Sequence, residues 1–177
     1  HQCNDFKGLP LVAAKPFKPF YVSPDDLPIV DFDDFECTVK NSREIFTAPH
    51  LIIKQSHKNG IFLSEVLDYD AVFNHSLLGV HGNINKLKYL SVVIGSRVFS
   101  YYHILTNRKW LVERDELEAG DIWQTPIPSP SDAEIAEACG IFDKLAISLS
   151  KNEKAEQFVR YMYRLKEYES HQIDDVI

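Results

Sequence analysis

The chain is organised around one long stretch, NKLKYLSVVIGSRVFSYYHIL at residues 85–105. Its apolar residues recur every three or four positions, which predicts a single amphipathic helix of about six turns. Asn83 or Asn85 is expected to cap its start, because a short polar side chain can accept hydrogen bonds from the free backbone N–H groups there. Gly95 lies inside this helix and costs about 1 kcal/mol relative to alanine. We therefore expect a close approach between helix and sheet at that point.

Three strands are predicted before this helix. Residues 51–53, Leu-Ile-Ile, form an apolar run flanked by Pro49 and a polar segment, as in a strand. Asn59-Gly60 is a strong turn signal, and residues 61–67 and 71–80 then read as two further strands. The economical arrangement is a three-stranded antiparallel sheet. The first 36 residues are punctuated by proline, which favours edge strands and extended loops.

The sequence after residue 105 predicts a short strand and then helices. Residues 109–112 are expected to return as a strand, and prolines keep residues 121–130 extended. Ser131 and Glu134 have the spacing of a capping box, which opens a helix with Ala138 and Phe142 on its apolar face. A second helix is predicted after residue 152. It would carry four apolar residues in register, Phe158, Met162, Leu165 and Tyr168.

Composition and motifs exclude several classes of protein. An apolar content of 45% is that of a folded protein, and no apolar run is long enough to span a bilayer. The chain starts with neither a signal peptide nor Met, so we interpret it as a fragment. Its three cysteines are far apart, which argues against a zinc site or a disulfide framework and favours a reducing, cytoplasmic setting.

No catalytic motif stands out. The chain has no glycine-rich phosphate loop, no nucleophile elbow and no D/N-P-P-Y/F motif. A nuclease is hinted at only by Pro24-Asp25 and Glu36…Lys40, with the wrong spacing. The seven histidines show no metal-binding pair, so no metal is expected. A triad built on Cys37 stays open, as does an enzyme pocket built on three histidines, His57, His75 and His103.

The net charge of −7 is unlike that of most nucleic-acid-binding domains, but the charges are segregated. Residues 81–110 hold five basic residues and no acid, whereas acids dominate residues 25–36 and 113–137. This distribution is compatible with one basic face on an acidic body, and equally with ordinary solvated surfaces.

Polar residues suited to DNA gather in three predicted loops. Lysine and arginine can bind phosphate or guanine, and asparagine and glutamine can bind adenine bidentately. The first loop holds Lys54, Gln55, Ser56, His57, Lys58 and Asn59; the second holds His81, Asn83 and Asn85; the third holds Asn107, Arg108 and Lys109. Arg97, from the acid-free stretch, completes the set of candidate DNA-binding residues.

In this order, the segments resemble the target recognition domain of adenine-specific DNA methyltransferases of type IIG restriction–modification enzymes, which is related to type I specificity subunits. Residues 45–54, IFTAPHLIIK, are similar to the family's F-x-x-P-x-L-h-h-K/R strand. Residues 87–98 are similar to its L-x-Y-L-x-x-h-L-N-S-x-L helix, with Gly95 where the family has Asn. Residues 122–128, IWQTPIP, resemble its I-x-x-L-P-I/L-P exit into a helix.

The resemblance covers about half of the chain and implies a fold and a function. The fold would be α+β, with a mixed, curved sheet packed against the long helix and a C-terminal helical hairpin. Residues 1–130 would form the recognition domain, and residues 131–177 a helical spacer or a hairpin packed on the same domain. The chain would bind double-stranded DNA without being an enzyme. A methyltransferase domain, in the same or another chain, would bind S-adenosylmethionine and methylate adenine, with or without an attached nuclease.

A second hypothesis stays open beside this one. The chain would then be a protein–protein interaction or regulatory domain without DNA binding, and would show an apolar patch around three tyrosines, Tyr161, Tyr163 and Tyr168.

Overall fold

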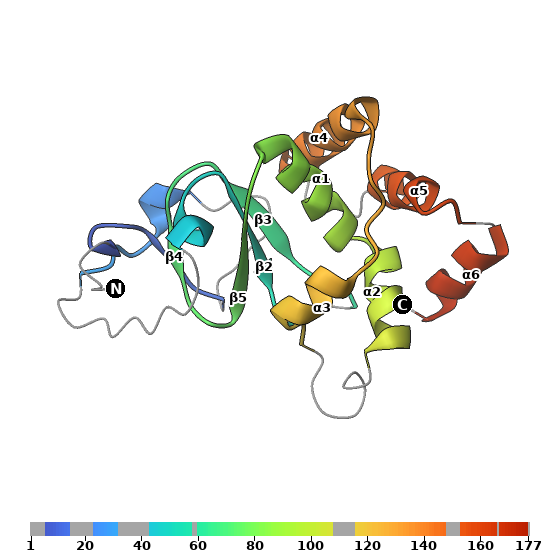
Figure 1. Ribbon diagram of the computed structural model, residues 1–177, viewed down its shortest axis with the longest axis horizontal. Helices are drawn as coiled ribbons and strands as arrows, with labels where there is room; N and C mark the ends of the chain where they lie inside the picture. The colour runs from blue at the N-terminus through green and yellow to red at the C-terminus, as the bar shows by residue number, and fades with distance from the viewer. Residues whose placement is uncertain are drawn as a thin grey trace.

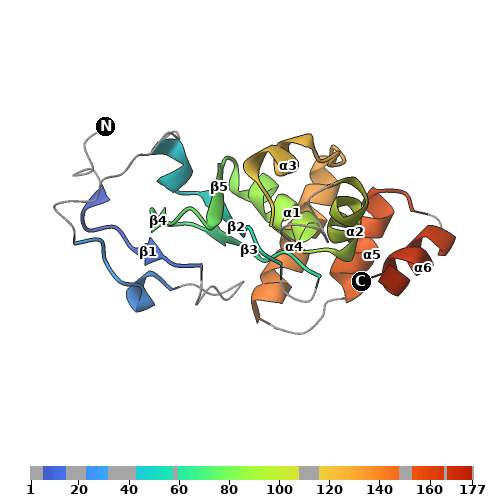
Figure 2. The ribbon, with the colours of Figure 1, turned by 90° about the horizontal axis from the view of Figure 1, so that it is seen from below.

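The computed structural model describes residues 6–14, 23–31, 43–57, 60–107, 116–147, 153–165 and 167–176. It shows an α+β protein in three layers, with an antiparallel sheet between the N-terminal segments and the helices (Figures 1 and 2). The expected α+β class is confirmed. The predicted turn residue Asn59 and the predicted strand at residues 109–112 lie outside the described residues.

The sheet is built around one central strand. β2 (His50–Lys54) pairs antiparallel with β3 (Ser64–Leu67) on one side and with β5 (Leu77–His81) on the other, as the sequence predicts. His50 lies opposite His81, and Lys54 lies opposite Leu77. The two ends of this sheet therefore carry different loops, a fact that decides the geometry of the candidate site.

Two expectations about the strands are wrong. The strand predicted over residues 71–80 is two strands, β4 (Val72–Phe73) and β5, because a turn at Asn74 separates them; its carbonyl accepts a hydrogen bond from the N–H of Leu77 (3.0 Å). The sheet is also not mixed. The parallel pair, β1 (Leu11–Val12) with β4, forms a second sheet of its own among the described strands.

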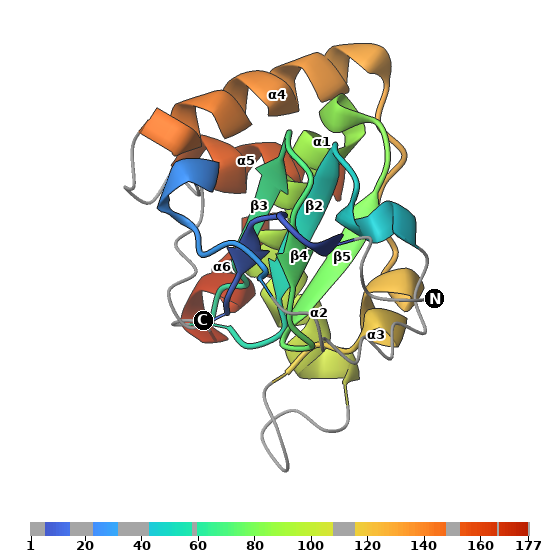
Figure 3. The ribbon, with the colours of Figure 1, turned by 90° about the vertical axis from the view of Figure 1, so that its left-hand side faces the viewer.

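Both faces of the central strand are buried, so the sheet has a core on each side. Leu51 and Ile53 point toward the helices, whereas Ile52 points toward the N-terminal segments, because successive side chains alternate across a strand. Figure 3 shows the N-terminal segments in front of the sheet and the helices behind it. The N-terminal core contains Phe6, Val12, Val30, Phe46, Ile52, Leu67, Ala71, Val72, Phe73 and Leu77.

The predicted long helix is two helices, α1 (Ile84–Ile94) and α2 (Arg97–Thr106). Asn83 caps α1 as expected, since its side chain accepts from the N–H groups of Asn85 and Lys86. Gly95 ends α1, and the Ser96 hydroxyl opens α2 by accepting from the N–H of Phe99 (3.2 Å). The apolar periodicity continues through this break, because both helices bury residues in the same core.

The segment before the prolines is helical over its first residues. α3 (Ala119–Gln124) includes residues 121–124, which were expected to be extended, and the Asp121 carboxylate closes its first turn by accepting from the N–H of Glu118 (2.8 Å). The chain is extended from Thr125 onward, where the prolines act. The hydroxyl of Tyr89 on α1 donates to the carbonyl of Pro128 (2.9 Å) and fixes this exit segment across the helix.

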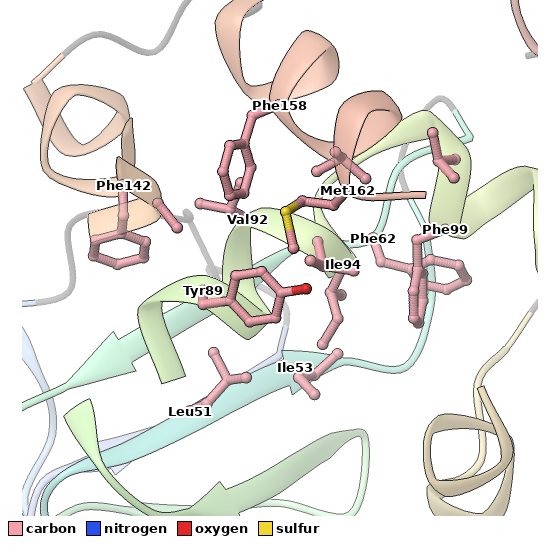
Figure 4. Packing of buried hydrophobic residues seen from close by; sticks show 14 of the residues in the cluster. Leu51, Ile53, Phe62, Tyr89, Val92, Ile94, Phe99, Phe142, Phe158 and Met162 are labelled. Atoms are coloured by element: carbon pink, nitrogen blue, oxygen red, sulfur yellow. The ribbon is translucent and has the colours of Figure 1, made fainter. Parts of the chain in front are cut away.

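The C-terminal region packs on the same core as the sheet. α4 (Asp132–Ile147) starts at the predicted capping box, in which the Glu134 carboxylate accepts from the N–H of Ser131 (2.7 Å). The prediction of a single helix after residue 152 is wrong. Two helices, α5 (Glu153–Met162) and α6 (Glu167–Val176), are separated by a turn in which Arg164 has a φ of 53°. Phe142 and Phe158 cover Val92 and Tyr89 of α1 (Figure 4).

Candidate nucleic-acid interface

The first predicted loop leaves the end of β2 and is held by backbone hydrogen bonds. The N–H of Gln55 donates to the carbonyl of Ser76 (3.2 Å), and its carbonyl accepts from the N–H of Leu117 (2.8 Å). Ser56 pairs with Glu116 in an isolated antiparallel bridge. Since the backbone of Gln55 is fixed on both sides, its half-buried side chain projects from a defined position.

His57 has a structural role in this loop. Its Nδ1 accepts from the N–H of Gly60 (3.2 Å), and its ring lies edge-on to Phe62 at 6.0 Å between centroids. Gly60 has a φ of +74°, the left-handed conformation that glycine adopts readily. Lys58 and Asn59, between these residues, lie outside the described part of the chain.

The third predicted loop begins at the same end of the sheet. Asn107 ends α2, and its N–H donates to the carbonyl of His103 (2.9 Å). The ring of His103 packs against Phe62, the residue that also contacts His57. The first and third loops are therefore neighbours, with α3 beside them (Figure 1). Arg108 and Lys109 lie outside the described residues.

The second predicted loop lies at the opposite end of the sheet. His81 is at the far end of β5 from Leu77, which pairs with Lys54. Four residues of strand, about 13 Å, therefore separate the two ends. The ring of His81 donates from Nδ1 to the carbonyl of Thr47 (3.1 Å), and the side chain of Asn83 is used by the helix cap. The three loops thus do not form one cluster.

Two cations of the acid-free stretch are paired with acids from the C-terminal helices. Lys88 Nζ lies 2.7 Å from a carboxylate oxygen of Asp143, and Arg97 Nη1 lies 3.0 Å from one of Asp174. The basic face expected over residues 81–110 is therefore neutralised at these two positions. The sequence could not reveal this, because the partners are 55 and 77 residues away.

Sequence reasoning missed a charged cluster between α2, α5 and α6. Arg160 donates to both carboxylate oxygens of Asp174 (3.2 and 2.7 Å), and Glu156 Oε1 accepts from the backbone N–H of Arg97 (2.8 Å). Hydrogen bonding to Arg160 is the main cause of the lowered pKa of Asp174, whereas burial raises the pKa of Glu156. The only sequence signal was the i, i+4 spacing of Glu156 and Arg160.

Two further histidines are buried in the cores. His50 is fully buried, and its Nδ1–H donates to the carbonyl of Ile45 (2.6 Å) while its Nε2 has no partner among the described residues. His103 is also buried, with Nε2 at 3.1 Å from Thr125 Oγ1. The described residues contain no group of three or more His, Cys, Asp or Glu side chains that could hold a metal ion.

Acidification is expected to destabilise the protein through these two buried histidines. Burial is the main cause that lowers the pKa of both His50 and His103 in the folded state. Below a pH of about 6.5 the unfolded chain therefore binds protons that the folded protein excludes, so the free energy of unfolding falls as the pH drops from that value toward the lowered pKa. Urea unfolding between pH 7.5 and 5.5 measures the slope.

The variant His103→Gln separates this effect from other titrating groups. It removes one of the two histidines that bind a proton more readily in the unfolded chain than in the folded protein. The free energy of unfolding of the variant should therefore depend less steeply on pH than that of the unaltered protein. Glu156, whose raised pKa acts in the opposite direction, is present in both proteins and cancels in the comparison. Equal slopes for the two proteins would contradict the prediction.

Comparisons with known proteins add no family. No family model matches the chain, and no curated protein is significantly similar to it. Among the described helices, none combines the length and the apolar character that crossing a membrane requires.

Proposed function

We propose that this chain is the DNA recognition module of an adenine-specific DNA methyltransferase of a restriction–modification system. The observation that carries the proposal is the meeting of the first and third loops at one end of the sheet, with Lys54, Gln55 and Asn107 half-buried there. The order of the three resembling motifs supports it. This chain binds the duplex, and a separate domain carries S-adenosylmethionine and the methylation chemistry.

The chemistry of these three side chains fits readout in the major groove. An amide such as that of Gln55 or Asn107 can donate to N7 and accept from N6 of one adenine, in the bidentate arrangement that discriminates bases. The ammonium of Lys54 binds a phosphate and sets the register without reading sequence. Ser56 and His57 hold the loop through the contacts described above. His81, Asn83 and Asn85, at the other end of the sheet, lie outside this reading surface.

The alternative of a protein–protein interaction domain receives less support. Tyr161 is exposed, but Tyr163 is half-buried against the helix-side core, and the side chain of Tyr168 lies outside the described part. The large exposed apolar side chains of the described residues are spread over separate segments: Ile29, Ile84, Leu105, Trp123 and Tyr161.

Selection from a randomised duplex library tests the proposal. The chain is expected to enrich one sequence, and Gln55→Ala or Asn107→Ala should each weaken binding to it by about tenfold with little effect on unrelated DNA. Lys54→Ala should weaken binding to both and reduce the salt dependence by about one phosphate contact. The affinity of each variant for the selected duplex and for unrelated DNA is measured by fluorescence anisotropy at several salt concentrations.

Asn85→Ala is the matched control. Asn85 is an exposed amide at the far end of the sheet, and its removal should leave the affinity unchanged. Enrichment of no sequence, or an equal loss for Asn85→Ala and Gln55→Ala, would overturn the proposal.

A further inference from the structure

Two arginines from different helices hold one carboxylate of the C-terminal helix. Arg97, at the start of α2, and Arg160, on α5, both donate to Asp174 Oδ1, at 3.0 and 2.7 Å. Arg160 also reaches Asp174 Oδ2 (3.2 Å) and the carbonyl of Ser170 (3.3 Å). Two guanidinium groups on one carboxylate form the donor arrangement that also binds a phosphate, because both anions offer paired oxygens to the planar fork.

The helix that supplies this carboxylate is short and acidic. α6 holds four acids, Glu167, Glu169, Asp174 and Asp175, and neither lysine nor arginine. Ten residues are too few for a stable isolated helix, so its order depends on packing. Ile173 is its fully buried apolar contact among the described side chains, with 2% of its surface exposed. The arginine pair and the buried Ile173 are therefore both contacts that hold α6 in place.

The arginine pair stays positive when the helix leaves. Glu156 lies beside it and accepts from the N–H of Arg97, so removal of Asp174 leaves two positive charges against one negative. Glu156 Oε2 and Arg160 Nε are buried without a hydrogen-bond partner among the described residues. Of these two atoms, Arg160 Nε carries a hydrogen that can be donated to an oxygen of an anionic ligand, whereas Glu156 Oε2 only accepts and does not contribute to such a site.

The position of the pair suits a DNA backbone contact. Arg97 and Asn107 lie at opposite ends of α2, which spans ten residues and about 15 Å. This length is close to the ~12 Å width of the major groove. A base-reading loop at one end of the helix and a phosphate clamp at the other can therefore engage the groove and its flanking strand together.

We propose that Arg97 and Arg160 form a phosphodiester-binding site that the chain's own Asp174 occupies until DNA displaces α6. The acidic helix acts as an intramolecular competitor, and this inference rests on the proposed function. A short connection between α5 and α6 keeps the Asp174 carboxylate at a high effective concentration beside the two arginines. The bound helix α6 therefore weakens DNA binding without abolishing it.

The test measures the affinity of the full chain for a 20-base-pair duplex of arbitrary sequence over a range of salt concentrations. Asp174→Asn should bind at least fivefold more tightly than the unaltered protein, with a salt dependence increased by about one phosphate contact. Asp174→Glu should behave as the unaltered protein, because it keeps the carboxylate. Arg160→Gln added to Asp174→Asn should cancel the gain.

Glu137→Gln controls for net charge, since Glu137 is an exposed acid on α4 and its change frees neither arginine. A gain equal to that of Asp174→Asn would overturn the inference, as would no gain for Asp174→Asn. Hydrogen exchange gives a second reading on the unaltered protein: saturating duplex should accelerate exchange in residues 167–176, and unchanged exchange would also overturn it.

The two proposals fail in different ways. A gain for Asp174→Asn on arbitrary DNA without any enriched sequence would remove the recognition function and keep the arginine site. An enriched sequence without an effect of Asp174→Asn would keep the recognition function and remove the arginine site.

Discussion

Replacement of Phe62 by alanine should lower the free energy of unfolding by about 3–5 kcal/mol, the range found for large aromatic residues in closed cores. Phe62 is completely buried and meets the rings of Phe99 and His103 edge-on, at 5.8 and 6.1 Å between centroids. Its removal leaves a cavity between the sheet and α2, because neither element can move inward without losing contacts elsewhere. Urea unfolding measures the change.

The same substitution should also weaken DNA binding, since Phe62 supports both His57 and His103 beneath the first and third loops. Tyr161→Ala is the control, because Tyr161 is 68% exposed and its loss should change stability by less than about 0.5 kcal/mol. A loss below about 1 kcal/mol for Phe62→Ala would mean that the site is not packed as described.

Gly79→Ala should destabilise the protein by about 1–3 kcal/mol, the cost of inserting a methyl group into a filled core. A Cβ at position 79 would overlap the ring of Phe73 and lie 3.3 Å from the carbonyl oxygen of Ile45. Gly79 faces Ile52 across the β2–β5 pair, so β5 cannot shift away without breaking the register of the central strand. The midpoint temperature of thermal unfolding measures this loss of stability.

Gly140→Ala is the matched substitution with the opposite sign. Gly140 lies inside α4, and a Cβ there would meet nothing within 4 Å. Alanine should therefore raise the free energy of unfolding by about 1 kcal/mol through its better helix propensity. Effects of the same sign at positions 79 and 140 would contradict the packing described for β5.

The sequence predicted the elements better than their ends. The run Leu51-Ile52-Ile53 indicated a buried strand, and its lack of alternation has a physical cause, since both faces are covered. Periodicity alone could not find the break at Gly95 and Ser96, because the buried stripe continues in the next helix. The prolines correctly predicted extended chain from Thr125. Pro126 restricts its own backbone and that of Thr125 before it, so residues 119–124 were free to form α3.

The candidate site was less predictable than the fold. Lys54, Gln55 and Asn107 were proposed because their residue types suit DNA and they end predicted elements. Their separation from His81 depends on the antiparallel register, which a list of loops does not contain. The pairing of Arg97 with Asp174 depends on how α6 packs, and no local pattern encodes a contact over 77 residues.

The central strand β2 also affects how the protein unfolds. It contributes Ile52 to the N-terminal core and Leu51 and Ile53 to the helix-side core, and it is hydrogen-bonded along both edges. Detachment of either layer would expose one face of this strand to water. We therefore expect detachment of the N-terminal layer to cost the burial of Ile52, and detachment of the helices to cost the burial of Leu51 and Ile53, which couples the unfolding of the two layers.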